Sequence, residues 1–314
     1  MAGLWTIGEI RKPEVMKNSG SSSRYSNDHL NYDILVRIFM ALNTAELLVA
    51  STVCKSWMQA SRNHLLWNKL DLTALNSSIF NVQKIRNTWN DIFSQRKLNL
   101  LLKLGVRLGN GNIRCLIFNY YTYFSDFQLI TAAERTPNLQ RLVFPDSGHL
   151  SKDGIYNAMR SWRGLVSITI TSIVNRPHMF SAIGKYCKNL SELKLTFDFE
   201  QHHADALVEH IPNLMVLSIR YVSVDMKALC HVLKSMERLV LVNICHSTIY
   251  DLSDYSIELY DIKSLRKHLS ISCLEKLISC QVNECCRCQR HNYDPRRHLE
   301  DIWHNDEVRC FAID

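Results

Sequence analysis

The stretch Asn138-Leu139-Gln140-Arg141-Leu142-Val143-Phe144 recurs along this chain with its apolar positions kept and its polar positions changed. Later copies include Asn189-Leu190-Ser191-Glu192-Leu193-Lys194-Leu195 and Asn213-Leu214-Met215-Val216-Leu217-Ser218-Ile219. The first apolar residues of the six copies are Ile113, Leu139, Leu165, Leu190, Leu214 and Met236, at steps of 26, 26, 25, 24 and 22 residues. Such a near-constant period predicts a repeat protein in which each unit stacks on its neighbours.

The pattern apolar-x-x-apolar-x-apolar at a period of roughly 20–29 residues is typical of leucine-rich repeats, in which a strand and a helix alternate. The segments between the expected strands agree, because apolar residues within 150–162 and 179–187 recur at helical spacing. A longer helix is expected over 82–106, and Leu70-Asp71-Leu72 is the expected first strand. The predicted fold class is therefore α/β, with parallel strands alternating with helices in a solenoid.

The composition is that of an ordinary globular protein. Of the 314 residues, 46% are apolar and 21% are charged, and there are only 10 glycines and 6 prolines, which excludes collagen-like and largely disordered chains. The longest apolar runs, such as residues 239–242, fall far short of the roughly 20 residues of a membrane helix, so no membrane partner is expected. The net charge of +7 is a mild excess without a recognised nucleic-acid motif, so nucleic acid is not an expected partner.

The cysteines indicate the compartment. There are 11 of them, and the first 30 residues lack the charged start and apolar core of a signal peptide, which predicts reduced thiols in a cytoplasmic and/or nuclear protein. Cys280, Cys285, Cys286, Cys288 and His291 lie close together in the sequence, and zinc prefers such ligands. Because no clean pair of Cys-x2-Cys units is present, reduced thiols on a terminal cap are favoured over zinc. No cofactor is predicted.

Four segments differ in character along the chain. Residues 1–27 lack apolar periodicity and predict a flexible arm, whereas residues 28–72 predict three short helices. Three such helices are too small to form a core of their own and must pack on something else. Residues 73–251 are assigned to the leucine-rich solenoid, and residues 252–314 to the capping segment that a solenoid needs over its last repeat.

Residues 30–72 carry a specific combination of side chains. It consists of Leu30-Asn31-Tyr32-Asp33-Ile34-Leu35-Val36-Arg37-Ile38-Phe39-Met40-Ala41-Leu42, Leu47-Leu48, Val53-Cys54-Lys55-Ser56-Trp57 and Trp67. This combination resembles an F-box. Asn31 stands where that family usually has proline, but asparagine can cap a helix instead, so the first helix is still expected. Together with repeats such as Lys185-Tyr186-Cys187-Lys188-Asn189-Leu190, the whole resembles a plant-type F-box and leucine-rich-repeat protein.

The resemblance implies a non-catalytic substrate receptor of a Skp–cullin–F-box ubiquitin ligase. The F-box would bind the Skp-type linker protein, and through it the cullin and RING subunits, while the repeats bind an unknown protein target for ubiquitination. The expected linker-binding residues are Leu30, Leu35, Ile38, Phe39, Leu42, Leu47, Val53, Cys54 and Trp57. Alternatively, these residues pack on the first repeat, and the chain is a scaffold or sensor outside any ligase. No nucleophile or metalloprotease signature occurs, so no catalytic or metal-binding residue is predicted.

The expected strands also define a candidate target surface. Side chains alternate along a strand, so the residues between the repeat leucines face the open side of the solenoid. The candidate residues are Arg141, Val143, Ser167, Thr169, Glu192, Lys194, Val216, Ser218, Arg238 and Val240, with Cys115 and Ile117 in the first repeat. Two alternatives remain open, namely that targets engage loops or the C-terminal end, and that the solenoid holds a small molecule.

Overall fold

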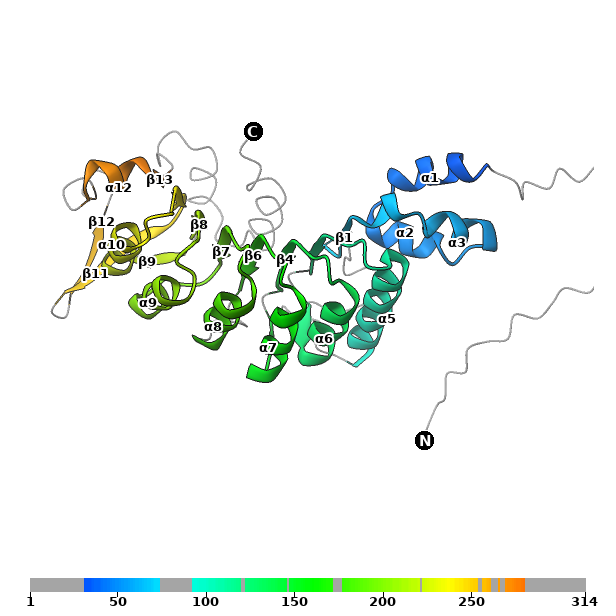
Figure 1. Ribbon diagram of the computed structural model, residues 1–314, viewed down its shortest axis with the longest axis horizontal. Coiled ribbons are helices and arrows are strands. Elements are labelled where there is room, and N and C mark those ends of the chain that lie inside the picture. Colours follow the sequence, from blue (N-terminus) through cyan, green and yellow to red (C-terminus); the bar gives the residue numbers. More distant parts are fainter. Residues whose placement is uncertain are drawn as a thin grey trace, which may run out of the picture.

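A computed structural model describes residues 31–73, 92–119, 122–145, 147–171, 177–220, 222–253, 256–260, 265 and 269–279. The predicted N-terminal arm, the first part of the helix expected over 82–106, and the cysteine-rich segment that begins at Cys280 lie outside the described residues. The described chain forms an α/β solenoid that carries a group of short helices at its N-terminal end (Figure 1).

An eight-stranded parallel sheet forms one layer of the solenoid, in the order β1-β2-β4-β6-β7-β8-β10-β13. Its strands are β1 (Lys69–Asp71), β2 (Cys115–Ile117), β4 (Arg141–Val143), β6 (Ser167–Ile170), β7 (Glu192–Leu195), β8 (Val216–Ser218), β10 (Leu241–Asn243) and β13 (Leu277–Ile278). Each repeat contributes one short strand, so neighbours in the sheet follow one another along the chain. The predicted first strand is confirmed, because Leu70 pairs with Leu116 in parallel register.

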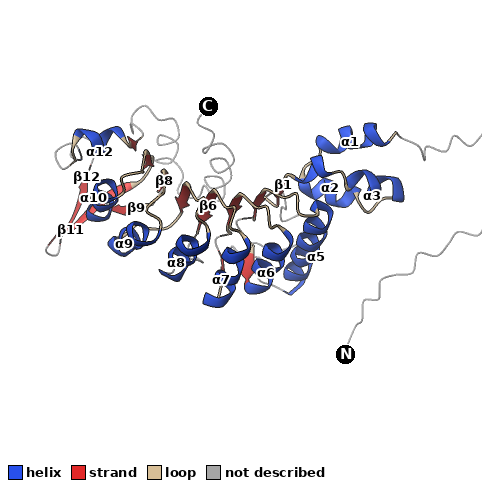
Figure 2. Ribbon diagram, in the orientation of Figure 1, coloured by secondary structure: helices blue, strands red, loops and turns tan. Residues whose placement is uncertain are grey.

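The connecting helices form a second layer on one side of this sheet (Figure 2). They are α5 (Ile92–Gly109), α6 (Asp126–Arg135), α7 (Lys152–Ser161), α8 (Pro177–Tyr186), α9 (Gln201–His210) and α10 (Met226–Ser235). The helices expected over 150–162 and 179–187 are thus confirmed as α7 and α8. The last described helix, α12 (Ile271–Glu275), precedes β13 at the C-terminal end of the sheet.

Two small sheets accompany the main one. Strand β3 (Tyr123–Ser125) pairs in parallel with β5 (Ser147–His149). Strand β11 (Thr248–Ser253) pairs in parallel with β9 (Ser223–Asp225) and antiparallel with β12 (Ser256–Tyr260). A helix follows at once, or within two residues, after each of the strands β3, β5 and β9. Their pairing therefore joins neighbouring repeats at the point where the chain enters the helix.

One continuous apolar core lies between the sheet and the helices. The repeat leucines Leu142, Leu193 and Leu217 are fully buried in it. The thiol of Cys187 lies 3.5 Å from the carbonyl oxygen of Trp162 in the preceding repeat, so the cysteine position links two units. The same core extends to Leu35 in the N-terminal helices, which therefore share the core of the solenoid rather than forming a separate one.

The register of the last predicted repeat is wrong. Leu241 pairs with Val216 and Asn243 with Ser218, so the unit begins at Leu239 rather than at Met236. Residues 239–242 are four consecutive apolar residues, which fit the repeat pattern in more than one register. Met236 is buried, but it is the cap residue after α10 and not the first residue of the repeat. The final step is therefore 25 residues instead of 22, which makes the period more regular.

Candidate functional site

The N-terminal helices are set by local capping. They are α1 (Tyr32–Met40), α2 (Thr44–Ala50), α3 (Lys55–Ser61) and the short 3-10 helix η2 (His64–Trp67). The side chain of Asn31 accepts a hydrogen bond from the Asp33 amide at 3.1 Å, which confirms that asparagine caps α1 in place of proline. Asn43 and Glu46 form a reciprocal capping box at the start of α2.

One face of these helices belongs to the core. Leu35, Phe39 and Leu47, three of the expected linker-binding residues, are buried in the chain itself. The ring of Phe39 meets that of Trp57 edge to face, with 5.4 Å between the centroids. Trp67 is fully buried, and its Nε1–H donates to the carbonyl of Ser61. For this inner face, the alternative in which these residues pack inside the chain therefore holds.

The other face of the same helices presents apolar side chains to the outside. Ile38 is 46% exposed, and Val53 and Cys54 are exposed as well, whereas Leu42 and Trp57 are half-buried. Further exposed apolar residues, absent from the expected set, are Tyr32, Ile34, Met40, Val49, Met58 and Leu65. The spacing of Ile34 and Ile38, one helical turn apart, is the sequence signal that could have revealed this face. Leu30 lies outside the described residues.

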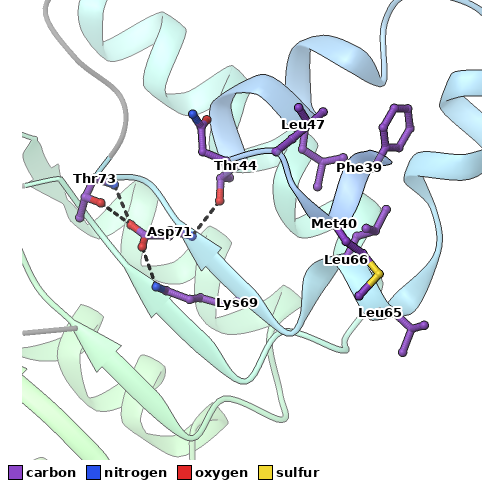
Figure 3. A pocket seen from close by; sticks show the side chains of 11 residues that line it. Phe39, Met40, Thr44, Leu47, Leu65, Leu66, Lys69, Asp71 and Thr73 are labelled. Atoms are coloured by element: carbon purple, nitrogen blue, oxygen red, sulfur yellow. Dashed lines mark hydrogen bonds and ion pairs between the residues drawn. The ribbon is translucent and has the colours of Figure 1, made fainter. Parts of the chain in front are cut away.

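A pocket of about 370 Å³ lies where the helices meet the first strand (Figure 3). Its apolar side includes Phe39 and Leu66, and its polar side is formed by β1. There Lys69 and Asp71 form an ion pair at 2.8 Å, and the Asp71 amide donates to the Thr44 hydroxyl at 3.2 Å. Burial raises the pKa of the Asp71 carboxyl, but hydrogen bonds from Lys69 and Thr73 outweigh it and lower the pKa below the usual value. These polar groups of β1 thus pair with one another and with the start of α2.

The strand residues expected to face a target lie on the sheet face opposite the connecting helices. By the pairing of the strands, one row runs through Lys69, Cys115, Arg141, Ser167, Glu192, Val216 and Leu241. A second row runs through Asp71, Ile117, Val143, Thr169, Lys194, Ser218 and Asn243. We call these two rows the concave face. It contains eight of the ten candidate target residues.

The remaining two candidates, Arg238 and Val240, are corrected. They are exposed and precede β10, because the last repeat starts three residues later than predicted. Leu241 and Asn243 occupy the corresponding positions on the concave face. The register also adds Lys69 and Asp71 at the other end of the two rows, so the junction pocket adjoins the concave face.

Three further features of the described residues concern metal binding, membrane crossing and thiol reactivity. No group of three or more histidine, cysteine, aspartate or glutamate side chains that could hold a metal ion is found among them. Within the same part of the chain no helix combines the length and apolar character needed to cross a bilayer. Burial raises the pKa of the Cys187 thiol to about 12, which keeps it protonated and unreactive.

Comparison with known proteins identifies this combination of helices and repeats. An F-box-like family model matches residues 30–73, which include α1 to η2 and strand β1. An F-box/LRR-repeat protein of Arabidopsis thaliana is 34% identical over 296 residues, which cover 91% of this chain and 96% of the relative. The chain belongs to the plant F-box/LRR-repeat family. Proteins of this family are generally non-catalytic substrate receptors.

Two further relatives support the assignment of this chain to the F-box/LRR-repeat family. A second Arabidopsis thaliana protein, named as an F-box protein, is 27% identical over 339 residues and covers 94% of this chain and 98% of its own length. The F-box protein SKIP1 of the same plant is 26% identical over 260 residues, which cover 75% of this chain and 84% of the relative. The similarity extends well beyond the F-box, so the relatives share the repeats as well.

Proposed function

We propose that this F-box/LRR-repeat protein is the substrate-recognition subunit of a Skp–cullin–F-box ubiquitin ligase. The observation that supports the proposal is the two-sided use of the F-box helices. Their inner face, with Leu35 and Phe39, completes the core of the solenoid, while their outer face exposes Ile34, Ile38 and Val53. Apolar side chains that remain exposed next to a completed core are typical of a protein-binding surface. The F-box resemblance implies that the partner is the Skp-type linker protein.

In this role the chain contributes proximity and no covalent chemistry. The outer face of the helices binds the linker, and through it the cullin and RING subunits, while the concave face or an adjoining surface binds the protein target. Holding the target beside the ubiquitin-loaded enzyme converts a bimolecular encounter into one at high effective concentration. The proposal therefore requires neither a catalytic residue nor a cofactor on this chain, and it places the protein in the cytoplasm and/or the nucleus.

The test is co-expression of the full chain with a Skp-type linker protein, followed by size-exclusion chromatography. Ile38→Asp is the variant of choice, because Ile38 is exposed on α1 and its replacement leaves the core intact. Replacement of Phe39 would not discriminate, since that ring is 1% exposed and its loss would disturb folding. Leu100→Asp is the matched control, because it places the same charge at an exposed apolar position on a helix of the solenoid, α5.

We expect wild type and Leu100→Asp to elute with the linker, and Ile38→Asp to elute alone with an unchanged circular dichroism spectrum. A charge in the centre of an apolar interface of this kind lowers affinity by about 2 kcal/mol or more, roughly 30-fold. Wild-type protein that elutes alone and folded would contradict the proposal. The scaffold or sensor outside any ligase would then be the better account.

A further inference from the structure

The layer of helices carries a group of cations and tyrosine rings that the proposed ligase function does not use. Helices α7 and α8 lie side by side in this layer, on the side of the sheet opposite the concave face (Figures 1 and 2). We call Lys152, Tyr156, Arg160, Lys185 and Tyr186 the α7–α8 patch. Its three cations are exposed and its two tyrosines are half-buried, so the patch is open to solvent.

The two tyrosine rings hold the cations of the patch in place. The rings of Tyr156 and Tyr186 meet edge to face, with 6.2 Å between their centroids. The guanidinium carbon of Arg160 lies 5.9 Å from the Tyr186 ring centroid, and the Nζ of Lys185 lies 5.2 Å from the same centroid. The Nζ of Lys152 lies 5.9 Å from the Tyr156 centroid. These are cation–π distances, and two positive charges therefore share one ring.

The positive charge of the patch is not balanced within the described part of the chain. Neither Arg160 nor Lys185 forms an ion pair with a described carboxylate. The sequence over residues 154–191, which spans the ends of both helices, contains no Asp or Glu. Two like charges beside one ring repel each other, so an anion that binds between them removes an unfavourable interaction.

The capping of the two helices does not account for these cations. Positive side chains at a helix C-terminus stabilise its dipole and its last carbonyls, and other residues fill this role here. The Nε–H of Arg163 donates to the carbonyl of Arg160 at 3.2 Å, and the Nζ of Lys188 donates to the carbonyl of Gly184. The charged ends of Arg160 and Lys185 lie against Tyr186 instead.

The hydroxyl of Tyr186 responds to the same two charges. Desolvation raises its pKa, but hydrogen bonding and positive charge from Lys185 and Arg160 outweigh this and lower the pKa below its usual value. The surface at Tyr186 therefore favours negative charge.

The geometry favours an acidic peptide over other anions. A phosphate is typically held by backbone N–H groups at a helix N-terminus, whereas Arg160 and Tyr186 lie at the C-terminal ends of α7 and α8. Bases of nucleic acids stack on open aromatic faces, but here cations lie over both rings. The rings lie 6.2 Å apart, close to the roughly 6.6 Å between alternate side chains of an extended peptide.

We propose that the α7–α8 patch binds a segment of a partner protein with acidic residues at alternate positions. One carboxylate of the segment contacts Arg160 and Lys185 beside Tyr186, and the next contacts Lys152 beside Tyr156. The segment binds on the layer of helices, so it leaves the concave face and the outer face of the F-box free. The inference does not depend on the proposed ligase function.

The experiment measures the fluorescence anisotropy of a labelled peptide of six Glu-Ser repeats as the full chain is added. Salt at about 0.15 M screens exposed charges beyond about 8 Å, so binding under this condition reports the charges of the patch itself. We expect saturable binding of the acidic peptide that weakens as more salt is added. A peptide of six Gln-Ser repeats, which has the same length and no side-chain charge, should not bind.

Two double variants separate the patch from the overall charge of the protein. Arg160→Glu with Lys185→Glu reverses the two charges beside Tyr186. Lys103→Glu with Arg107→Glu makes the same change in net charge at exposed positions of α5, a helix that also lacks acidic residues. We expect the first variant to bind the acidic peptide about tenfold more weakly and the second to stay within about twofold of wild type. Both should still elute with the linker protein, so failure here is distinguishable from failure of the ligase function.

The ring of Tyr186 is tested by two single variants. Tyr186→Phe keeps a ring against which Arg160 and Lys185 can lie, so its affinity for the acidic peptide should stay within about twofold of wild type. Tyr186→Leu removes the ring and should weaken binding by about threefold, because the two cations are no longer held in place.

Four results would overturn the inference. Absence of binding by wild type, or equal weakening in the two double variants, would show that the patch is not a specific site. Tighter binding of a peptide with a single phosphothreonine would identify phosphate as the ligand. Tighter binding of a thymidine oligonucleotide would identify nucleic acid as the partner. Equal binding by wild type and Tyr186→Leu would show that the ring does not position the cations.

Discussion

The pH dependence of folding tests the buried imidazole of His203. This side chain lies on α9, is 2% exposed, and has its ring centroid 5.0 Å from that of Phe197. Its Nδ1 accepts a hydrogen bond from the Glu200 amide at 3.0 Å, which completes the cap of α9. Burial, together with the imidazole of His202 beside it, lowers the pKa of His203 from 6.5 to about 4.

The lowered pKa means that the folded state binds this proton more weakly than the unfolded state does. Stability from the neutral imidazole is therefore complete above the unfolded value near 6.5, and it is lost as the pH falls toward the folded value near 4. For this pair of values, a fall from pH 7.5 to pH 5 lowers the free energy of unfolding by about 2 kcal/mol through His203 alone. Carboxylates contribute little above pH 5, and comparison with a variant at His203 separates this imidazole from the other 12 of the chain's 13 histidines.

The assay is urea unfolding of the full chain at pH 7.5 and pH 5. His203→Gln keeps an oxygen that can accept from the Glu200 amide but cannot titrate, so its stability should change by about 2 kcal/mol less than that of wild type over this range. His64→Gln, a change at an exposed histidine of η2, is the control and should retain the wild-type pH dependence. Equal losses of stability in wild type and His203→Gln would refute the reasoning.

Three further predictions concern packing and reactivity. Gly184→Ala places a Cβ 2.1 Å from the backbone oxygen of His210, so it should push α8 and α9 apart and lower the free energy of unfolding in urea by about 1–3 kcal/mol, while an unchanged midpoint would contradict the contact. Trp67→Phe removes the hydrogen bond to a buried carbonyl and should cost about 1–3 kcal/mol in the same assay. In native protein, iodoacetamide should label the exposed Cys54 well before the buried Cys187, whose thiol has its pKa raised to about 12, and mass spectrometry of early time points decides the order.

The repeat pattern predicted the solenoid correctly because the same apolar spacing occurs in six copies, so an error in one copy does not change the predicted fold. The leucine spacing alone placed the strands that contain Leu142, Leu193 and Leu217, and all three are buried as expected. The prediction failed where the signal was locally ambiguous, in the apolar run 239–242, because periodicity cannot choose between registers that are equally apolar. The pairing of Leu241 with Val216 fixes the register. This pairing depends on the neighbouring strand β8, which lies outside the ambiguous stretch of sequence.

The F-box residues show a second limit of sequence reasoning. Helix α1 carries the buried Leu35 and Phe39 and the exposed Ile34 and Ile38, so it is apolar on more than one face. A helix with a single apolar stripe reveals which side is buried, but one with two apolar faces does not. The residue types predicted the helix correctly, while only the packing against the solenoid separates its inner face from its outer one. Whether the outer face binds the linker stays a prediction.

The short accessory strands could not be predicted from the sequence for a different reason. Strands β3, β5 and β9 have three residues each, too few for an alternating pattern to stand out. The burial of the concave face was equally hidden, because a pattern of alternating side chains predicts which face they share and not how exposed that face is. The burial of Val143 and Lys194 appears only when the whole chain is folded.

The shared core has a consequence for how such a receptor would work. Trp67 stands two residues before β1, as Ile113 does before β2, so the last F-box residue in η2 occupies the first position of a repeat. The Asp71 amide bonds to Thr44 across the same junction. A flexible tether between the two parts would spread a bound target over a large volume, with an effective concentration in the millimolar range. A continuous sheet and core instead fix the concave face relative to the outer face of the F-box, so under the proposed function folding itself sets the position of a target relative to the linker.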